Sequence, residues 1–354
     1  MEQSKLEMKI SERKMSYAKP QYLVETDWLA QHLNDSGLRI FDVTGILQFS
    51  VRQFLRDGIS NLGRFMHGLP FIGKQPVNWI KMLAPNLKNI SKERSYDKGH
   101  IPGAVFLDVA SARGGLSDAD ATLPWTWPKK EQFEALMSQI GVRNNSQVVL
   151  YASTPRKGID DGTMWCTRAW WVMHHFGVQC AVLNGGWEKW VAEGRAVSTS
   201  SGSYPAATFL ADPQWRRCLA NKEDVLAALQ SPGSACVVDA LSAESYSGTD
   251  GPAYGPRKGH IAGAVNVPMY SLVDQDTGLF ASADDMRLHF EKAGVLSAGK
   301  VITYCGGGLA STVDAFALAL LGHTNVAVYD NSLFEWAEDQ SLPMTDPSSA
   351  RGKP

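Results

Sequence analysis

The chain has 354 residues, of which 44% are hydrophobic and 20% are charged, as in ordinary globular proteins with a substantial core. Its 34 lysines and arginines nearly balance 36 aspartates and glutamates, and the resulting net charge of −2 argues against nucleic-acid binding. The length favours two domains rather than one.

The first 20 residues mix acidic and basic side chains and lack the apolar core of a secretory signal. We expect residues 1–20 to be a solvated tail. The five cysteines show neither Cys-x-x-Cys nor Cys/His ligand spacing, which predicts no disulfide framework and no metal site. Because scattered thiols suit a reducing compartment, we expect a cytoplasmic protein, with the mitochondrion as the alternative.

Four short signatures recur in the same order in the two halves of the chain. They are an apolar run that ends in aspartate, a Gly-His-Ile turn, a second apolar run, and a third apolar run that leads into a helical stretch with tryptophan. Repetition of this kind indicates two copies of one fold. The paired segments are 39–44 and 236–241, 98–109 and 258–269, 147–154 and 300–307, and 180–194 and 326–339.

Apolar residues recur at helical spacing over 129–141, 282–294 and 311–323, which predicts a helix in each segment. Ser311 or Thr312 stands where it could cap the start of the last helix. These helices alternate with the apolar runs, so we expect an α/β fold with a mainly parallel sheet flanked by helices in each half. In such sheets, ligands bind at the carboxyl ends of the strands.

Cys305 stands at such a strand end, in the stretch VITYCGGGLAST (301–312). The glycines that follow, Gly306, Gly307 and Gly308, allow successive backbone N–H groups to converge on an anion. The predicted helix start adds a partial positive charge. Both effects favour thiolate over thiol and predict a nucleophilic cysteine. The alternative is a tight turn whose cysteine is incidental.

Two chemistries use a cysteine in such a loop. Cysteine phosphatases need an arginine six positions after the nucleophile to bind the phosphoryl group. That position is Ser311, and the loop carries no basic residue, which argues against a phosphatase or an arsenate reductase. Sulfur transfer needs only the N–H groups to hold a persulfide anion, so the sequence favours it.

The remaining evidence lies in the motifs GHIPGAVFLD, GHIAGAVNVP, VLNGGWEKW, VYDNSLFEW and CGGGLAS. Together they resemble the tandem-domain rhodanese family of thiosulfate and 3-mercaptopyruvate sulfurtransferases, from about residue 22 to residue 343. The resemblance implies two tandem rhodanese-like domains, of which the second is catalytic. The first lacks the thiol, because Ala152 stands at the position that corresponds to Cys305. The expected division is an inactive domain at 21–200, a linker at 201–212, a catalytic domain at 213–345 and a tail at 346–354.

The resemblance further implies a sulfurtransferase in which Cys305 carries a sulfane sulfur as a persulfide. A thiol, such as that of a thioredoxin-like protein, or cyanide would accept it, with no cofactor or metal. Arg257 and Lys258, just before the second Gly-His-Ile turn, would bind a small anionic donor. The loop residues expected to hold the anion are Gly306, Gly307, Gly308, Leu309, Ala310 and Ser311.

The donor stays open between thiosulfate and 3-mercaptopyruvate. The uncharged loop is closer to that of the mercaptopyruvate enzymes, yet these often carry serine where this chain has Gly307. A Ser/His/Asp relay would therefore lack its hydroxyl, although Asp97 and His100 lie near the expected first-domain motif. We expect His100 and His260 to form hydrogen bonds that hold their turns, rather than to play an auxiliary catalytic role.

The stretch 45–95 is longer than related proteins typically need, and it combines helical apolar spacing with an excess of basic side chains. We expect a helical insertion folded over its own domain, with contact to an anionic membrane surface as the less favoured alternative. The lost thiol of the first copy suggests a rival function, a non-catalytic rhodanese-like binding or regulatory module. The retained Cys305 and its complete glycine loop argue against that rival.

Overall fold

The computed structural model describes residues 17–49, 87–157, 161–212, 218–231, 233–252 and 254–345. Residues 50–86 of the insertion, on which most of the helical and membrane-surface predictions fall, lie outside these ranges, as do most residues of the two tails. Strands β3 (Leu47–Phe49) and β4 (Leu87–Asn89) pair antiparallel, so the two ends of the insertion lie side by side.

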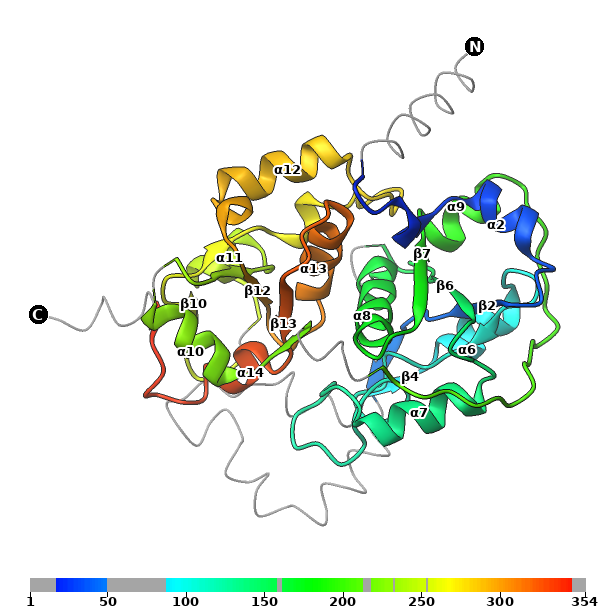
Figure 1. The fold of residues 1–354 in the computed structure, drawn as a ribbon, viewed down its shortest axis with the longest axis horizontal. Coiled ribbons are helices and arrows are strands. Elements are labelled where there is room, and N and C mark those ends of the chain that lie inside the picture. The colour runs from blue at the N-terminus through cyan, green and yellow to red at the C-terminus, as the bar shows by residue number, and fades with distance from the viewer. Residues whose placement is uncertain are drawn as a thin grey trace, which may run out of the picture.

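Two five-stranded sheets with parallel pairing organise the chain (Figure 1). The order β1-β7-β6-β2-β5 in the first sheet matches β8-β13-β12-β9-β11 in the second, which confirms the predicted α/β class and the duplication. The first sheet contains β1 (Leu23–Val24), β2 (Leu38–Asp42), β5 (Val105–Phe106), β6 (Gln147–Tyr151) and β7 (Gln179–Leu183). The second contains β8 (Leu219–Ala220), β9 (Cys236–Asp239), β11 (Val265–Asn266), β12 (Val301–Tyr304) and β13 (Val326–Tyr329).

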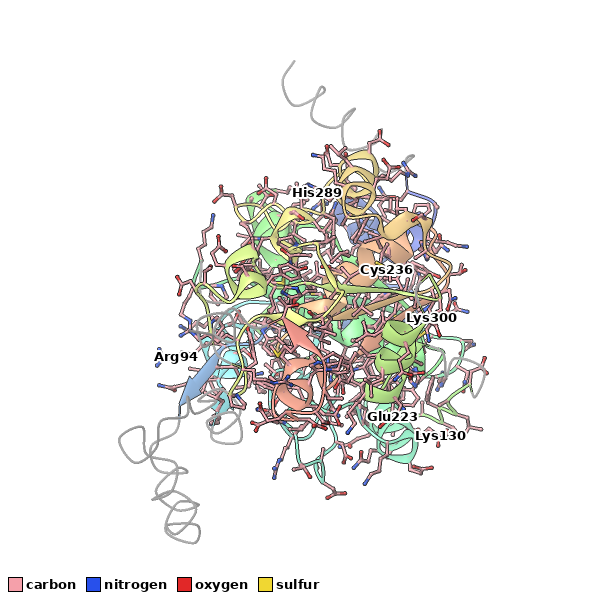
Figure 2. All side chains as sticks on the ribbon, turned by 90° about the vertical axis from the view of Figure 1, so that its left-hand side faces the viewer. Arg94, Lys130, Glu223, Cys236, His289 and Lys300 are labelled. Atoms are coloured by element: carbon pink, nitrogen blue, oxygen red, sulfur yellow. The ribbon has the colours of Figure 1, made fainter. Side chains whose placement is uncertain are left out.

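Helices flank both sheets, and charged side chains such as Arg94, Lys130 and Glu223 project into solvent (Figures 1 and 2). The first domain has η1 (Pro20–Tyr22), α2 (Thr26–His32), α6 (Ser91–Arg94), η3 (Tyr96–Lys98), α7 (Lys130–Gln139), α8 (Gly162–His175) and α9 (Gly186–Ala192). The second has α10 (Lys222–Gln230), α11 (Ala243–Ser247), η5 (Met269–Ser271), α12 (Ala283–Lys292), η6 (Val295–Ser297), α13 (Ser311–Leu320) and α14 (Ser332–Trp336), with β10 (His260–Ile261) paired to β14 (Met344–Thr345). Among the described residues, no helix combines the length and apolar character that a membrane crossing requires.

The three helices predicted from apolar spacing are present as α7, α12 and α13. Gly141 and Gly294 follow the first two with positive φ, as expected for glycines that end helices. The predicted capping of α13 by Ser311 or Thr312 is wrong. Ser311 and Thr312 are the first two residues inside the helix, and its N-cap is Ala310, which supplies no side-chain hydrogen bond.

The two domains meet along α8 and α13, which lie side by side (Figure 1). The hydroxyls of Thr167 and Thr312 lie 2.9 Å apart, and the rings of Trp170 and Phe316 meet edge to face with centroids 4.8 Å apart. One hydrophobic core therefore continues from the first domain into the second. This interface places the loop before α13 next to side chains of the first domain.

The predicted linker, 201–212, runs along the first domain without regular secondary structure. The Ala207 N–H donates to Ser138 O (2.8 Å), and the side chain of Phe209 is buried. This segment therefore packs as part of the first domain's surface layer, while the exact domain division stays a prediction.

Helix α13 is buried along its whole length, yet it contains an acid, Asp314. Within the described part of the chain, neither carboxyl oxygen of Asp314 has a hydrogen-bond partner. Burial, and to a lesser degree the charge of Asp239, raise the pKa of Asp314 well above its usual range. A buried carboxyl whose oxygens have no hydrogen-bond partner among the described residues lowers the stability of the fold.

Replacing Asp314 by leucine, which has a similar shape and no polar atoms, should raise the apparent melting temperature by the equivalent of at least about 1 kcal/mol. The gain should be larger at about pH 8 than at about pH 5. The pKa of the Asp314 carboxyl is higher in the folded protein than in the unfolded chain. The stability of the wild type is therefore greatest below the unfolded-state pKa and falls as the pH rises through the folded-state pKa. Melting curves at the two pH values measure this.

The matched control is Glu291→Leu, which replaces an exposed acid of α12. It should change the stability at each of the two pH values by no more than about 0.5 kcal/mol. A lower melting temperature for Asp314→Leu at both pH values would contradict the prediction.

Candidate functional site

Cys305 directly follows β12, at the carboxyl edge of the second sheet. It is buried, with 2% of the residue exposed. The Cys305 N–H donates to Ser332 Oγ (3.1 Å), and this hydroxyl donates to Tyr329 O (2.6 Å). Ser332 has a φ of +49°, a conformation that non-glycine residues rarely adopt. The fold thus holds a strained residue directly behind the nucleophile.

The carbonyl groups of the cysteine loop are anchored on its outer side by the first turn of α14. Leu333 N–H donates to Cys305 O (3.1 Å), and Phe334 N–H donates to Gly306 O (2.9 Å). A side chain of the first domain anchors a third carbonyl, that of Gly308. A trans peptide group is planar, with C=O and N–H on opposite sides, so each anchored carbonyl turns the following N–H away from its anchor.

In the described ranges, none of the backbone N–H groups of residues 306–311 donates a hydrogen bond. These groups directly follow the thiol, and the start of α13 adds the positive end of a helix dipole. Unpaired donors beside a sulfur atom can stabilise negative charge on that sulfur. The arrangement can therefore perform the anion-holding role expected of Gly306, Gly307, Gly308, Leu309, Ala310 and Ser311.

Gly307 is enclosed by the ring of Phe334, and a Cβ at Gly307 would lie 2.2 Å from it. The ring is in turn held between Trp125 of the first domain (centroids 6.4 Å apart, nearly parallel) and Tyr254 (5.9 Å). A serine side chain has no room at this position. Packing thus explains why the chain lacks the hydroxyl of a Ser/His/Asp relay.

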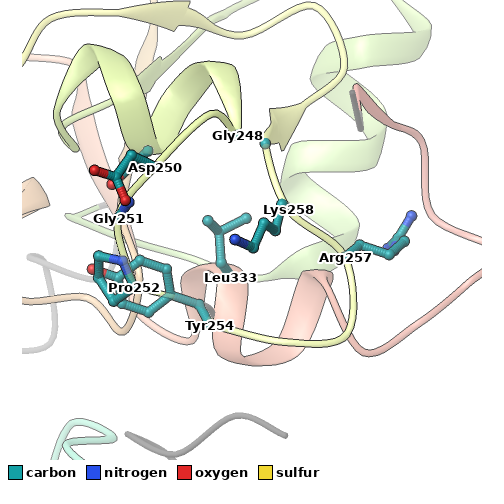
Figure 3. Close-up of a pocket in the computed structure, with 10 residues that line it drawn as sticks. Gly248, Asp250, Gly251, Pro252, Tyr254, Arg257, Lys258 and Leu333 are labelled. Carbon is teal, nitrogen blue, oxygen red and sulfur yellow. The ribbon is translucent and has the colours of Figure 1, made fainter. Parts of the chain in front are cut away.

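A small pocket lies beside the loop (Figure 3). Tyr254 lines it and packs over Gly306, where a Cβ would lie 1.9 Å from the tyrosine ring. The Lys258 ammonium points into the pocket, with Asp250 on the opposite rim. Partial burial and, secondarily, the nearby Cys305 raise the pKa of Tyr254, so its hydroxyl stays protonated at neutral pH. Lysine and tyrosine together offer hydrogen-bond donors to an anionic ligand.

Arg257, predicted to bind the donor, lies at the pocket's edge, and its guanidinium turns away from the pocket (Figure 3). It donates to the carbonyl oxygens of Trp336 (2.5 Å), Ala337 (3.2 Å), Asp339 (2.6 Å) and Leu342 (2.7 Å). These acceptors belong to the end of α14 and the turn after it. Arg257 therefore satisfies carbonyls at a helix end, which holds α14 against the loop.

The auxiliary residues considered from the sequence serve their own turns. His100 is fully buried, bonds through Nδ1 to Tyr96 O (2.8 Å), and stacks on the Tyr96 ring. His260 bonds in the same way to Tyr246 O (2.7 Å). Asp97 accepts from a lysine on the surface. No hydrogen bond between described residues joins these side chains to the cysteine loop, so the auxiliary catalytic role does not fit them.

The first domain repeats the anchored loop without the thiol. Trp187 N–H donates to Ala152 O (3.1 Å), the counterpart of the bond that anchors the nucleophile's carbonyl in the second domain. Here, however, the loop already holds an anion, because Glu188 Oε1 accepts from Thr154 N–H (2.8 Å) and from Ser153 Oγ (2.7 Å). This copy lacks the thiol, and the amide two residues after Ala152, that of Thr154, is already bound to a carboxylate.

Several residues that shape the site gave no separate signal in the sequence. Ser332 and Phe334 fall inside the VYDNSLFEW motif, which pointed to the fold but not to the site. Tyr254 and Trp125 lie in irregular segments, where side-chain direction cannot be read from periodicity. Each reaches the loop only through tertiary packing.

A buried strand-end thiol followed by unpaired amides, in the second of two like α/β domains, defines a sulfurtransferase-like protein. The family model "Rhodanese-like domain" matches residues 25–193 and 221–339, and the chain therefore belongs to the rhodanese-like family. The match covers both domains, including Ala152 in the first and Cys305 in the second.

Relatives of two donor types are similar to the chain. 3-mercaptopyruvate sulfurtransferase of Escherichia coli strain K12 is 29% identical over 331 residues, covering 91% of this chain and 97% of that protein. Thiosulfate sulfurtransferase of Bos taurus is 32% identical over 272 residues, covering 76% and 86%. The crystal structure of a 3-mercaptopyruvate sulfotransferase from Escherichia coli superposes with a TM-score of 0.64 at 28% identity, covering 88% of this chain and 98% of that one.

Substituting Gly307 by serine should lower the melting temperature, because the new side chain collides with Phe334 at a cost of about 1–3 kcal/mol. Phe334→Ala removes the obstacle, so the double variant should lose less stability than the sum of the two single variants. A double-mutant cycle of unfolding measurements gives this coupling. Gly299→Ser, where a Cβ meets nothing within 4 Å, is the control and should be neutral. Additive effects of the two substitutions would refute the packing account.

Arg257 and Lys258, adjacent in sequence, should respond differently to replacement. Arg257→Gln should lower the melting temperature, since it leaves several carbonyls after α14 unpaired at about 1 kcal/mol or more in total. Lys258→Gln should leave the melting temperature unchanged and raise the donor KM several-fold, because it removes an exposed cation that makes no ion pair with any described residue. Steady-state kinetics and melting curves on both variants test this, and the reverse pattern would restore Arg257 as the donor-binding residue.

Proposed function

We propose that the protein is a sulfurtransferase that moves a sulfane sulfur from thiosulfate or 3-mercaptopyruvate to a thiol or cyanide through a Cys305 persulfide. The observation that carries the proposal is the run of unpaired N–H groups at 306–311 directly after the buried thiol. Homology to sulfurtransferases of both donor types supports it.

In the first half-reaction, the Cys305 thiolate attacks the outer sulfur of the donor. With thiosulfate, the S–S bond breaks and sulfite leaves with the electron pair. With 3-mercaptopyruvate, the C–S bond breaks, and the carbon takes up the proton of the donor thiol to give pyruvate. In both cases the sulfur remains on Cys305 as a persulfide anion, which the amides of 306–311 stabilise.

In the second half-reaction, an acceptor thiolate or cyanide attacks the terminal sulfur of the persulfide. The S–S bond breaks and returns the Cys305 thiolate, so the cycle is ping-pong and needs no further cofactor. A thioredoxin-like protein is the macromolecular acceptor we propose. Because the cycle depends on a reduced thiol, we also propose a cytoplasmic location.

The donor would enter by the pocket that Lys258 and Tyr254 line. Both candidate donors carry an anionic group that an ammonium and a phenolic hydroxyl can bind. The uncharged loop supports 3-mercaptopyruvate over a donor that needs a cation inside the loop, whereas Gly307 does not supply the hydroxyl that mercaptopyruvate enzymes often carry. The absence of a relay hydroxyl leaves both donors in contention.

Intact-mass measurement after incubation with each donor tests the proposal. The protein should gain the mass of one sulfur atom with at least one donor and lose it on addition of cyanide. Cys305→Ala should gain none, whereas Cys218→Ala, which replaces a thiol outside the loop, should load as the wild type does. Failure of both donors to load Cys305 in the folded protein would favour the non-catalytic binding module instead.

A further inference from the structure

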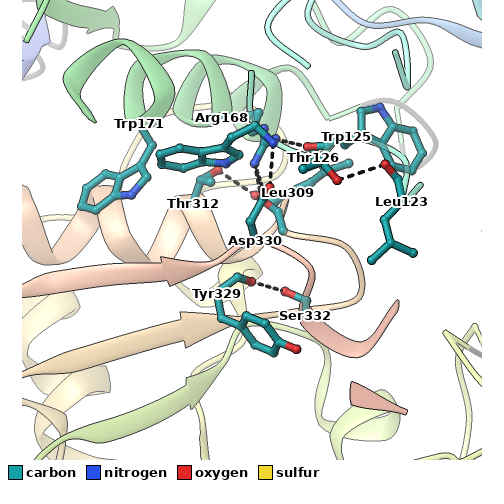
Figure 4. Close-up of polar contacts among 12 residues, drawn as sticks. Leu123, Trp125, Thr126, Arg168, Trp171, Leu309, Thr312, Tyr329, Asp330 and Ser332 are labelled. Atoms are coloured by element: carbon teal, nitrogen blue, oxygen red, sulfur yellow. Dashed lines mark hydrogen bonds and ion pairs between the residues drawn. The ribbon is translucent and has the colours of Figure 1, made fainter. Parts of the chain in front are cut away.

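Arg168 of helix α8 in the first domain lies in a buried polar cluster at the domain interface (Figure 4). Only 1% of Arg168 is exposed. Its Nη1 donates to Asp330 Oδ1 (2.6 Å), and its Nη2 donates to Trp125 O. The other oxygen of Asp330 accepts from Trp127 N–H (2.8 Å). The cluster thus joins two segments of the first domain to the residue after β13 in the second.

The same guanidinium reaches the cysteine loop. Arg168 Nη1 lies 3.2 Å from Gly308 O and donates to it. Gly308 has a φ of +74°, and a Cβ there would lie 2.2 Å from Asp330 O. Asp330 and Arg168 therefore fix the position of Gly308 in the cysteine loop, Asp330 through close packing and Arg168 through a hydrogen bond. Because the peptide group is planar, an anchored Gly308 carbonyl points the Leu309 N–H away from Arg168.

We propose that Arg168 is a positioning residue for sulfur transfer, through which the first domain sets the direction of the Leu309 N–H in the Cys305 loop. The proposal rests on the function proposed above. Among the described residues, Arg168 does not line the donor pocket, and its contact with the cysteine loop is the hydrogen bond to Gly308 O. This gives the domain without a thiol a part in the chemistry of the other domain.

Arginine suits this position because its planar fork presents several N–H donors in fixed directions. One guanidinium meets Asp330, Trp125 O and Gly308 O together, and its carbon lies 5.5 Å from the centroid of the Trp127 ring. A lysine could pair with the carboxylate but could not keep all three acceptors. Arg168→Lys therefore removes the positioning while it leaves the buried charge of Asp330 paired.

The test compares Arg168→Lys with two controls. Arg39→Lys changes another buried arginine, which donates only to carbonyls of the first domain: Gly141 O, Ser36 O and Leu38 O. Lys157→Gln removes an exposed contact between the domains, that with Asp276. The first control matches the loss of a buried guanidinium, and the second matches the loss of an interdomain contact.

Two readouts are measured on each protein. The ultraviolet thiolate absorbance at neutral pH, after subtraction of the same variant with Cys305→Ser, reports the thiolate fraction of Cys305 without any donor. Single-turnover loading with the donor that labels the wild type gives the rate constant and the donor concentration for half-maximal rate. Melting curves show whether each variant is folded.

For Arg168→Lys we expect the thiolate signal to fall by more than half and the loading rate to fall by roughly tenfold, less than the loss on deleting a whole oxyanion donor. The donor concentration for half-maximal rate should stay within about twofold, since the donor pocket is untouched. Both controls should keep the wild-type thiolate signal even if their melting temperatures fall. If Arg168→Lys does not fold, Arg168→Met/Asp330→Asn, which removes both buried charges together, takes its place with the same expectations.

A folded Arg168 variant with the wild-type thiolate signal and loading rate would overturn the proposal. A fall of the thiolate signal in the Lys157→Gln control would also overturn it, because any weakening of the interface would then suffice. Failure of the wild type to load sulfur would defeat the proposed function, whereas the thiolate readout would still decide whether Arg168 positions the loop.

Discussion

Planar peptide groups allow a protein to aim amide hydrogens by anchoring the carbonyl groups behind them, and the site around Cys305 depends on this constraint. Two carbonyls of the loop are held by the first turn of α14 and a third by Arg168. The N–H groups that follow these three carbonyls therefore point away from their anchors.

The surrounding side chains make this arrangement rigid rather than adaptable. Phe334 and Tyr254 occupy the space that side chains at Gly307 and Gly306 would need. Arg257 fixes the far end of α14, so the helix that anchors the loop is itself anchored. Stabilisation of a developing charge is strongest when the donors need no reorganisation, which is the benefit that such close packing provides.

The sequence was sufficient for the parts of the site that are local. The fold follows from two repeated strand–helix patterns, and Cys305 with its glycine loop occupies one continuous stretch. The direction of the Arg257 guanidinium, toward the carbonyls after α14, could not be predicted, because proximity to the Gly-His-Ile turn says nothing about which way a long side chain points. Arg168 was missed because its acceptors are Gly308 O and Asp330, more than a hundred residues away along the chain. The helical prediction for the 45–95 insertion is wrong at its two ends, which pair as the strands β3 and β4, and it stays a prediction for residues 50–86, which lie outside the described ranges.

Comparison of the two loops shows what separates the inactive copy from the active one beyond the missing thiol. Alignment of the tryptophans that end the two helical motifs places Glu188 of the first domain opposite Phe334 of the second. Glu188 accepts from the N–H of Thr154, whereas Phe334 packs over the equivalent residue, Gly307, and offers no acceptor. A carboxylate at this position accepts the hydrogen bond of the loop amide. An aromatic ring at the same position accepts none and leaves the amide available to a ligand. Restoring a cysteine at position 152 alone would therefore create a thiol beside a donor set that an internal anion already occupies, and reactivity would require removal of the Glu188 carboxylate as well.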